Sequence, residues 1–142
     1  MQHIPYILIV DDDPALLQAL PQAILLRLGQ ARVETVNSAD DALLLIQQND
    51  YDAIISDIKM PGMDGLMLLA KIQEISPETP TLLITGHGEH DLTVQALRGG
   101  AYDFILKPIE RDYFVVAIRR AVQTRQLRRQ VAEQQKALEQ HA

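Results

Sequence analysis

The chain has 142 residues, of which 47% are hydrophobic and 4% aromatic, so we expect one domain with a mostly aliphatic core. It contains no cysteine, which excludes disulfides, thiolate metal sites and cysteine nucleophiles. No apolar run approaches the ~20 residues that span a bilayer, and the first residues lack the features of a signal peptide. The sequence therefore predicts a cytoplasmic protein without a membrane segment.

The formal net charge of −6 is distributed unevenly along the chain. Residues 1–118 contain seven Lys and Arg against 17 Asp and Glu, whereas residues 119–142 contain six against two. The acidic charge of residues 1–118 predicts no direct contact between this domain and nucleic acid, although the basic charge of residues 119–142 keeps that contact open.

The chain begins with an apolar strand and a helix that contains a proline. Residues 6–10 are apolar throughout, which is typical of a strand buried on both faces. Pro14 suits the first turn of a helix over residues 14–28. Pro21 lies inside that helix, where it removes one backbone hydrogen bond and costs about 3 kcal/mol relative to alanine. We expect one helix with a kink between Leu17 and Pro21.

The middle of the chain repeats the alternation of strand and helix. Residues 32–36 alternate in polarity, which indicates a strand nearer the edge of a sheet. Ser38 can cap a helix over residues 39–48. A third strand is predicted over residues 52–56, where the apolar run at 53–55 is typical of burial on both faces, and Leu66, Leu69 and Ile72 at helical spacing predict a helix over residues 66–75.

Two further strands and helices follow. A fourth strand is predicted over residues 81–84, and a short helix with a thin apolar stripe is predicted over residues 89–98, where Gly99-Gly100 ends it. The fifth strand is predicted over residues 102–106, and the last helix opens over residues 110–120.

Strands that alternate with helices imply a parallel sheet covered on both faces. The predicted fold class is α/β, a flavodoxin-like doubly wound sheet of five strands in the order 2-1-3-4-5, with an extended C-terminal helix. In that order the first and third strands are neighbours, so Asp11, Asp12 and Asp57 should share one crevice at their carboxyl ends.

The composition changes after residue 120. Residues 121–142 contain no Gly or Pro and are predicted to be helical. Leu127, Val131 and Leu138 form a weak heptad pattern. We therefore divide the chain into a domain at 1–120 and a helical segment at 121–142, which is either a solvated linker toward an output domain or the start of a coiled coil. A homodimer through helix 110–140 is possible on this pattern.

Four strand ends carry polar groups that suit phosphoryl chemistry. The aspartates after the first strand and Asp57 form a hard oxygen site of the kind that Mg²⁺ prefers. Asp57 can act as a nucleophile toward a phosphoryl group. Lys107 supplies a positive charge for the phosphoryl oxygens, Thr85 supplies a hydroxyl, and Gly86 lets a backbone N–H approach them.

Each of these residues also has a purely structural explanation. Asp12 or Asp13 could cap the first helix, Thr85 could cap a turn, and Lys107 could be a surface lysine. All three explanations would have to hold at once, each at a different strand end, which favours the site.

The chain resembles the receiver domain of two-component response regulators, in particular receivers of the nitrogen-regulator type, from about Tyr6 to Arg120. Four motifs in the family's order carry the resemblance, and they occupy residues 7–13, 57–65, 85–86 and 100–108. The resemblance implies a signal-transduction protein that is phosphorylated by a histidine kinase. It implies no enzyme activity beyond its own phosphorylation and dephosphorylation.

The resemblance also implies roles for single residues. Asp57 becomes the phospho-acceptor. Mg²⁺ is bound by the side chains of Asp12 and Asp57 and the backbone carbonyl of Lys59, with Asp11 acting through water.

The remaining implied roles concern the switch between two states. Thr85 is the switch hydroxyl, Phe104 the switch aromatic and Lys107 the phosphate-binding lysine, and Gly86 joins Thr85 and Lys107 around the phosphate. The face formed by helix 89–98, the fifth strand and helix 110–120 then controls a partner, a dimer or a downstream output domain.

Two alternatives remain open at this point. A phosphatase of the haloacid dehalogenase type would use Asp11 as nucleophile and Asp13 as acid/base, although Pro14 is unusual for such enzymes. A scaffold that functions without phosphorylation and dimerises through its tail is the second alternative.

Overall fold

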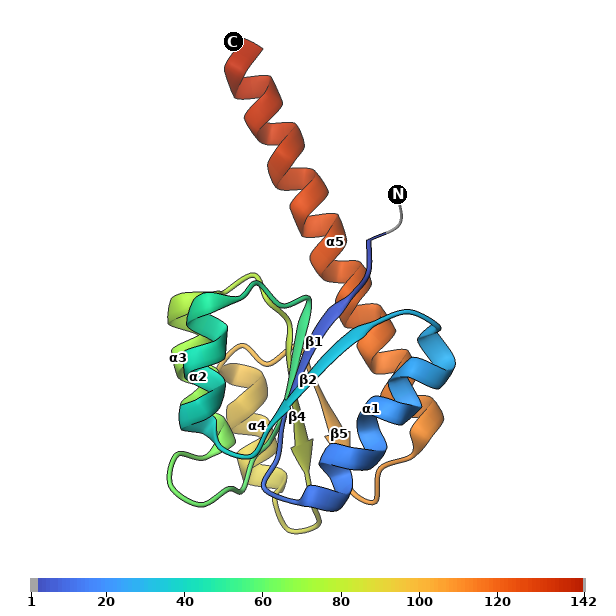
Figure 1. The fold of residues 1–142 in the computed structure, drawn as a ribbon. Coiled ribbons are helices and arrows are strands. Elements are labelled where there is room, and N and C mark those ends of the chain that lie inside the picture. Colours follow the sequence, from blue (N-terminus) through green and yellow to red (C-terminus); the bar gives the residue numbers. More distant parts are fainter. Residues whose placement is uncertain (1–2, 142) are drawn as a thin grey trace.

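A computed structural model describes residues 3–141, which form a five-stranded parallel sheet between two layers of helices (Figure 1). The strand order is β2-β1-β3-β4-β5, as the sequence predicted. The strands are β1 (Tyr6–Val10), β2 (Arg32–Val36), β3 (Ala53–Asp57), β4 (Thr81–Thr85) and β5 (Asp103–Leu106). The helices are α1 (Pro14–Leu28), α2 (Ala39–Gln48), α3 (Gly65–Ile75), α4 (His90–Arg98) and α5 (Arg111–His141).

The two faces of the sheet have separate aliphatic cores. On one face, α1 and α5 pack on a cluster that includes Ile9, Ile55 and Phe114. On the other face, α2 and α3 cover Leu8 and Ile54, and a smaller cluster lies between α3 and α4. The central strands are buried on both faces, which is why their sequences are mostly apolar.

The carboxyl ends of β1 and β3 meet at one edge of the sheet. The two strands are hydrogen-bonded neighbours, with Val10 opposite Ser56. β2 pairs only with β1 and contains no fully buried residue, so it is the edge strand that its alternating sequence indicated. Asp11 follows β1 and Asp57 ends β3, which places both at the switch point where open sheets bind ligands.

Several predicted boundaries are wrong by one residue, each for an identifiable reason. The third strand covers 53–57 and not 52–56, because Asp57 still pairs with Ile84 while Asp52 uses its carboxylate to accept the Tyr6 N–H. The fourth strand includes Thr85, whose carbonyl accepts the Lys107 N–H at 2.7 Å.

The other boundary differences concern the ends of helices and the start of the last strand. α4 and α5 begin one residue later than predicted, since Glu89 and Glu110 lie just outside them. The carboxylate of Glu110 accepts backbone N–H groups from the first turn of α5, which is the role of a cap. α3 includes Gly65, and β5 starts at Asp103, where its pairing with Leu82 begins.

The first helix runs unbroken through its proline. Asp13 is the N-cap and accepts the Ala15 N–H, and Gly29 ends the helix with a φ of 81° that favours glycine. Pro21 lies inside, on a partly buried face. The kink that we expect near Leu17 stays a prediction.

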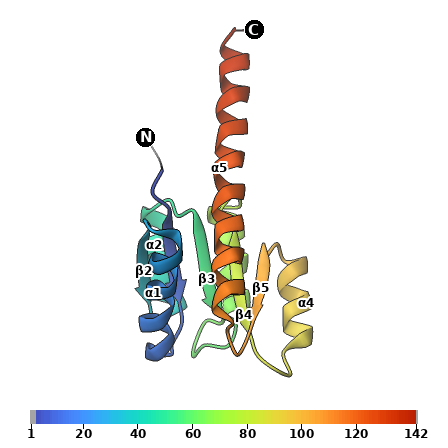
Figure 2. The ribbon, with the colours of Figure 1, turned by 90° about the vertical axis from the view of Figure 1, so that its right-hand side faces the viewer.

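The last helix packs on the domain farther than its composition suggested. Ala121, Val122 and Arg125 are buried, although residues 121–142 were predicted to form a solvated linker or a coiled coil. From residue 130 to residue 140 every side chain is exposed, and this part of α5 extends beyond the sheet (Figure 2). The docked segment therefore ends near Arg129.

An ionic cluster, which we call the exit clamp, fixes the place where α5 leaves the domain. It consists of Arg125 and Arg129 of α5 together with Asp50, Asp52 and His3. Arg129 donates to Asp52 at 2.8 Å and to Asp50 at 2.9 Å, and Arg125 donates to Asp50 at 2.9 Å. Asp52 is fully buried, so its charge depends on these partners. The clamp lies at the end of the sheet opposite Asp57.

Within residues 3–141, none of the helices has both the length and the apolar composition that crossing a membrane requires.

Candidate functional site

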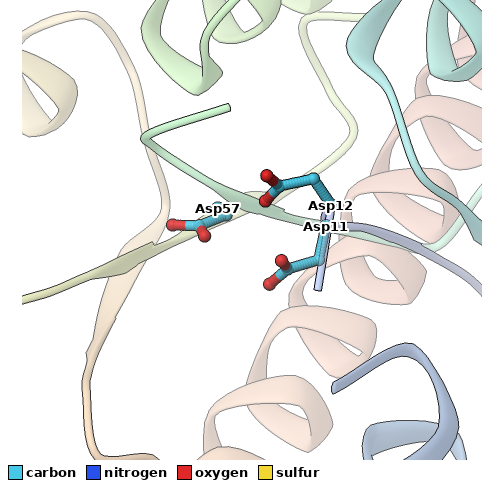
Figure 3. A group of neighbouring side chains, drawn as sticks. All are labelled: Asp11, Asp12 and Asp57. Carbon is cyan, nitrogen blue, oxygen red and sulfur yellow. The ribbon is translucent and has the colours of Figure 1, made fainter. Parts of the chain in front are cut away.

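Three carboxylates from two neighbouring strands converge at the carboxyl end of the sheet. Asp11, Asp12 and Asp57 each place an oxygen within 4.8 Å of the others, and Figure 3 shows the side chains of Asp11 and Asp12 directed to the side on which Asp57 lies. Asp11 and Asp57 are buried, whereas Asp12 is exposed. The strand order creates this cluster, because Asp57 lies 46 positions after Asp11 in the sequence.

Asp11 is the most constrained of the three. Its Oδ1 accepts the Asp13 N–H at 2.9 Å, while its buried Oδ2 has no hydrogen-bond partner among the residues that the structure describes. Burial, together with the charges of Asp57 and Asp12, raises the pKa of Asp11 to about 6, and the Asp13 N–H and Lys107 offset part of this rise.

This donor set fits a hard divalent cation. A buried carboxylate oxygen without a donor, close to two further carboxylates, is costly unless a positive charge neutralises it. Mg²⁺ is bound by one or two carboxylates and keeps several waters, which suits a cluster with one exposed member. The geometry is thus compatible with the predicted magnesium site.

Lys107 brings a fixed positive charge to the acceptor. It follows β5, and its Nζ donates to Asp57 Oδ2 at 3.0 Å. Burial alone would lower the pKa of Lys107, but the hydrogen bond and charge of Asp57, with the charges of Asp11 and Glu89, raise it above the ordinary value. The lysine is therefore a stable ammonium beside a carboxylate that is only 4% exposed.

The predicted switch residues lie on one side of this cluster. Thr85 is the last residue of β4 and is buried. Thr85, Gly86 and Phe104 line one hollow of about 350 Å³, together with Leu97 of α4. Phe104 is half-buried, with space on the side facing α4.

Lys59, the remaining predicted site residue, lies in the loop after β3. Its side chain is 69% exposed and turns to Glu89, with 3.8 Å between Nζ and Oε1. The role predicted for its backbone carbonyl stays a prediction.

A comparison with protein families matches residues 7–119 to the response regulator receiver domain. The chain belongs to this family. The match covers the sheet, all four strand ends and the first turns of α5, so the receiver includes every residue of the site described above.

Curated relatives of this receiver are transcriptional regulators. The C4-dicarboxylate transport transcriptional regulatory protein DctD of Rhizobium meliloti (strain 1021) is 42% identical over 127 residues, which cover 89% of this chain and 27% of that protein. The nitrogen assimilation regulatory protein NtrX of Azorhizobium caulinodans is 41% identical over 137 residues, 95% of this chain and 30% of that protein. The receiver thus spans less than a third of these relatives.

Solved structures confirm the fold. The signal receiver domain of an HD domain-containing protein from Pseudomonas fluorescens Pf-5 superposes with a TM-score of 0.84 at 30% identity, covering 92% of this chain and 95% of that one. NtrX from Brucella abortus gives a TM-score of 0.81 at 37% identity, covering 92% of this chain and 29% of that one.

The receiver assignment leaves the phosphatase alternative without support. That alternative needs Asp13 as acid/base, but Asp13 is exposed and its carboxylate accepts the Ala15 N–H as the cap of α1. The capping role that the sequence offered for Asp12 or Asp13 thus belongs to Asp13.

Glu89 is a residue of the receiver's site that the sequence reasoning missed. Its Oε2 accepts the Gly86 N–H at 2.8 Å, so the donor expected to approach a phosphate is already engaged. The sequence carries no clear signal for this contact, because Gly86 is neither Ser nor Thr and both residues precede α4, unlike the two partners of a capping box.

Proposed function

We propose that this receiver accepts a phosphoryl group on Asp57 from the phosphohistidine of a histidine kinase, in a reaction that requires Mg²⁺. The observation that carries the proposal is the joint placement of Lys107 at 3.0 Å from Asp57 and of three carboxylates within 4.8 Å of one another. A helix cap or a surface ion pair explains neither the burial of Asp11 nor the convergence of four strand ends.

The chemistry follows from the groups present. A carboxylate oxygen of Asp57 attacks phosphorus and forms a P–O bond while the P–N bond to the imidazole breaks. The imidazole nitrogen leaves with the bonding electrons and takes up a proton. Lys107 stabilises the charge on the phosphoryl oxygens, and the Thr85 hydroxyl and the Gly86 N–H donate to the same group.

The cation would be held by the side chains of Asp12 and Asp57 and the backbone carbonyl of Lys59, with Asp11 acting through water. When bound, Mg²⁺ supplies positive charge that offsets the repulsion between an acidic pocket and an incoming phosphoryl group. Without a cation, the negative charges of Asp11 and Asp12 oppose transfer to Asp57.

The output of this reaction is a change on the face formed by α4, β5 and α5. A phosphoryl group adds acceptor oxygens that draw Thr85 toward it, and Phe104 can then fill the space that Thr85 leaves. Exposed apolar side chains already lie on this face, namely Leu97, Leu106, Tyr113 and Val116. They suit a partner protein or an output domain.

The exposed part of α5 is the second output element. We assign residues 1–120 to the receiver domain and 121–142 to a helical segment that connects it to an output domain. Leu127, Val131 and Leu138 are exposed along this segment. They support self-association through helix 110–140, as a coiled coil that phosphorylation strengthens or weakens.

The test is intact mass spectrometry after treatment with an acyl phosphate and Mg²⁺. Wild type should gain one phosphoryl group, Asp57→Asn should gain none, and Asp13→Asn, which keeps the cap of α1, should behave as wild type. Chelation of Mg²⁺ should abolish the gain. Equal incorporation by wild type and Asp57→Asn would remove the assignment, and no incorporation by any variant would favour the scaffold alternative.

A further inference from the structure

Glu89 connects the phosphoryl site to the start of α4. Its backbone carbonyl accepts the Thr93 N–H at 2.9 Å and the Thr93 hydroxyl at 3.0 Å, which are the first bonds of the helix. Its side chain makes no cap for α4 and turns back to the loop after β4 instead. One residue thus holds the helix with its backbone and the site with its carboxylate.

The carboxylate is placed among donors that suit a phosphate. Oε2 accepts the Gly86 N–H at 2.8 Å, Oε1 lies 3.8 Å from Lys59 Nζ, and the side chain is only 12% exposed. Its charge also acts on Lys107, whose pKa it helps to raise. Glu89 is therefore a fourth negative charge at the edge of the cluster around Asp57.

We infer that the carboxylate of Glu89 occupies the Gly86 N–H in the unphosphorylated receiver, and that a phosphoryl group on Asp57 takes this N–H when it is added. Phosphorylation then expels Glu89 and releases the start of α4. The inference deepens the proposed function and rests on it. Glu89 is a positioning residue here, because it acts through the Gly86 N–H and does not touch the reacting atoms.

Three physical arguments support the exchange. One N–H group cannot donate a full hydrogen bond to two anions at once, and a phosphoryl group brings a charge of about −1.5 to −2 that repels a nearby carboxylate. Displacement is also weakly opposed by packing, since Thr93 and Ala96 are the only buried residues of α4. A helix held by few apolar contacts moves when its anchoring hydrogen bond is removed.

The exchange has a measurable consequence through linkage. A contact that exists only in the unphosphorylated form stabilises that form by a certain factor. It lowers the affinity for a phosphoryl mimic by the same factor. We expect Glu89→Ala to bind beryllofluoride with Mg²⁺ roughly tenfold more tightly than wild type, the effect of one hydrogen bond to a charged group. Glu89→Gln keeps an acceptor oxygen but not the charge, so its gain should be smaller.

Amide exchange gives the structural readout. Residues 90–98 of unliganded Glu89→Ala should exchange faster than in wild type and approach the rates of wild type with beryllofluoride. Asp91→Ala is the matched control, because it removes an exposed carboxylate from the first turn of the same helix. It should leave the affinity for beryllofluoride within about twofold of wild type, as expected for a solvent-exposed charge.

The outcomes separate this inference from the proposed function. If wild type binds beryllofluoride and Asp57→Asn does not, yet Glu89→Ala and Glu89→Gln both bind as wild type does, the role of Glu89 is refuted while the acceptor stands. A gain in Asp91→Ala equal to that of Glu89→Ala would attribute the effect to net charge and also refute it. If wild type does not bind the mimic through Asp57, both proposals fail.

Discussion

Replacing Asp11 by asparagine should stabilise the receiver when no metal is present. The buried Oδ2 of Asp11 has no donor within residues 3–141, and the pKa of this carboxyl is raised from 3.8 to about 6. Asparagine keeps an acceptor for the Asp13 N–H and replaces the oxygen that has no partner with an NH₂ group. The substitution thus removes a buried charge without leaving a cavity.

The size of the effect follows from the pKa. Because the folded state raises the pKa, it binds the proton more tightly than the unfolded chain, and the charged form destabilises the fold. At about 1.4 kcal/mol per pKa unit, this cost reaches about 3 kcal/mol above pH 6, declines as the pH falls, and vanishes below 3.8. For a domain of this size, that is a difference in Tm of roughly 10 °C.

Thermal unfolding of wild type and Asp11→Asn in a chelating buffer, from about pH 4 to about pH 7.5, measures this difference. The variant should be more stable at the upper end, and the two curves should converge near pH 4, where a protonated aspartate resembles asparagine. Added Mg²⁺ should stabilise wild type at pH 7.5 and have a smaller effect on the variant. Asp13→Asn is the control and should follow wild type.

Two results would refute the reasoning. A difference between Asp11→Asn and wild type that does not change with pH would show that the charge of Asp11 is not its cause. A variant less stable than wild type at pH 7.5 without metal would show that the carboxylate has a partner that stabilises its charged form.

Three further predictions concern neighbouring features. Asp12→Ala should weaken Mg²⁺ binding in calorimetric titration more than Asp13→Ala does; the opposite order would reverse the roles of the two residues. Gly65→Ala should destabilise the fold by about 3 kcal/mol in urea unfolding, because the new Cβ would lie 2.8 Å from Ile58 Cα and overlap the Asp57 carbonyl; an unchanged midpoint would contradict this. Arg129→Gln should lower the free energy of unfolding by about 2 kcal/mol and speed amide exchange in residues 121–130, because buried Asp52 loses its arginine. Unchanged exchange in these residues would mean that the exit clamp does not hold α5.

The fold was predictable because its strands carry an unambiguous signal. β1, β3 and β4 are mostly apolar, and each ends at or just before a polar residue, so their burial, their parallel pairing and the edge position of β2 followed from composition and alternation. The contact between Asp57 and Lys107, 50 residues apart, was predictable for the same reason, because both lie at carboxyl ends of the sheet.

Interactions that depend on the path of a single side chain were not predictable. The bond from Gly86 to Glu89 requires the loop after β4 to turn back on itself, and local propensity does not specify that turn. The pairing of Arg129 with Asp52 joins residues 77 positions apart that share no periodicity, so no sequence pattern predicts that the docked part of α5 extends beyond residue 120.

The attachment of α5 at Arg129 fixes the rotation of the rest of the helix about its own axis, relative to the receiver. Each residue beyond the exit clamp advances the helix by ~1.5 Å and rotates it by ~100°, so the directions of Val131 and Leu138 are set by the count of residues from the clamp. Removing one residue after Arg129 would turn both side chains by about 100° relative to the receiver, whereas removing seven would return a following helix to within about 20° of its original direction. The number of residues after Arg129 therefore determines the direction in which a side chain points. It also determines the orientation of any partner that is attached to the helix.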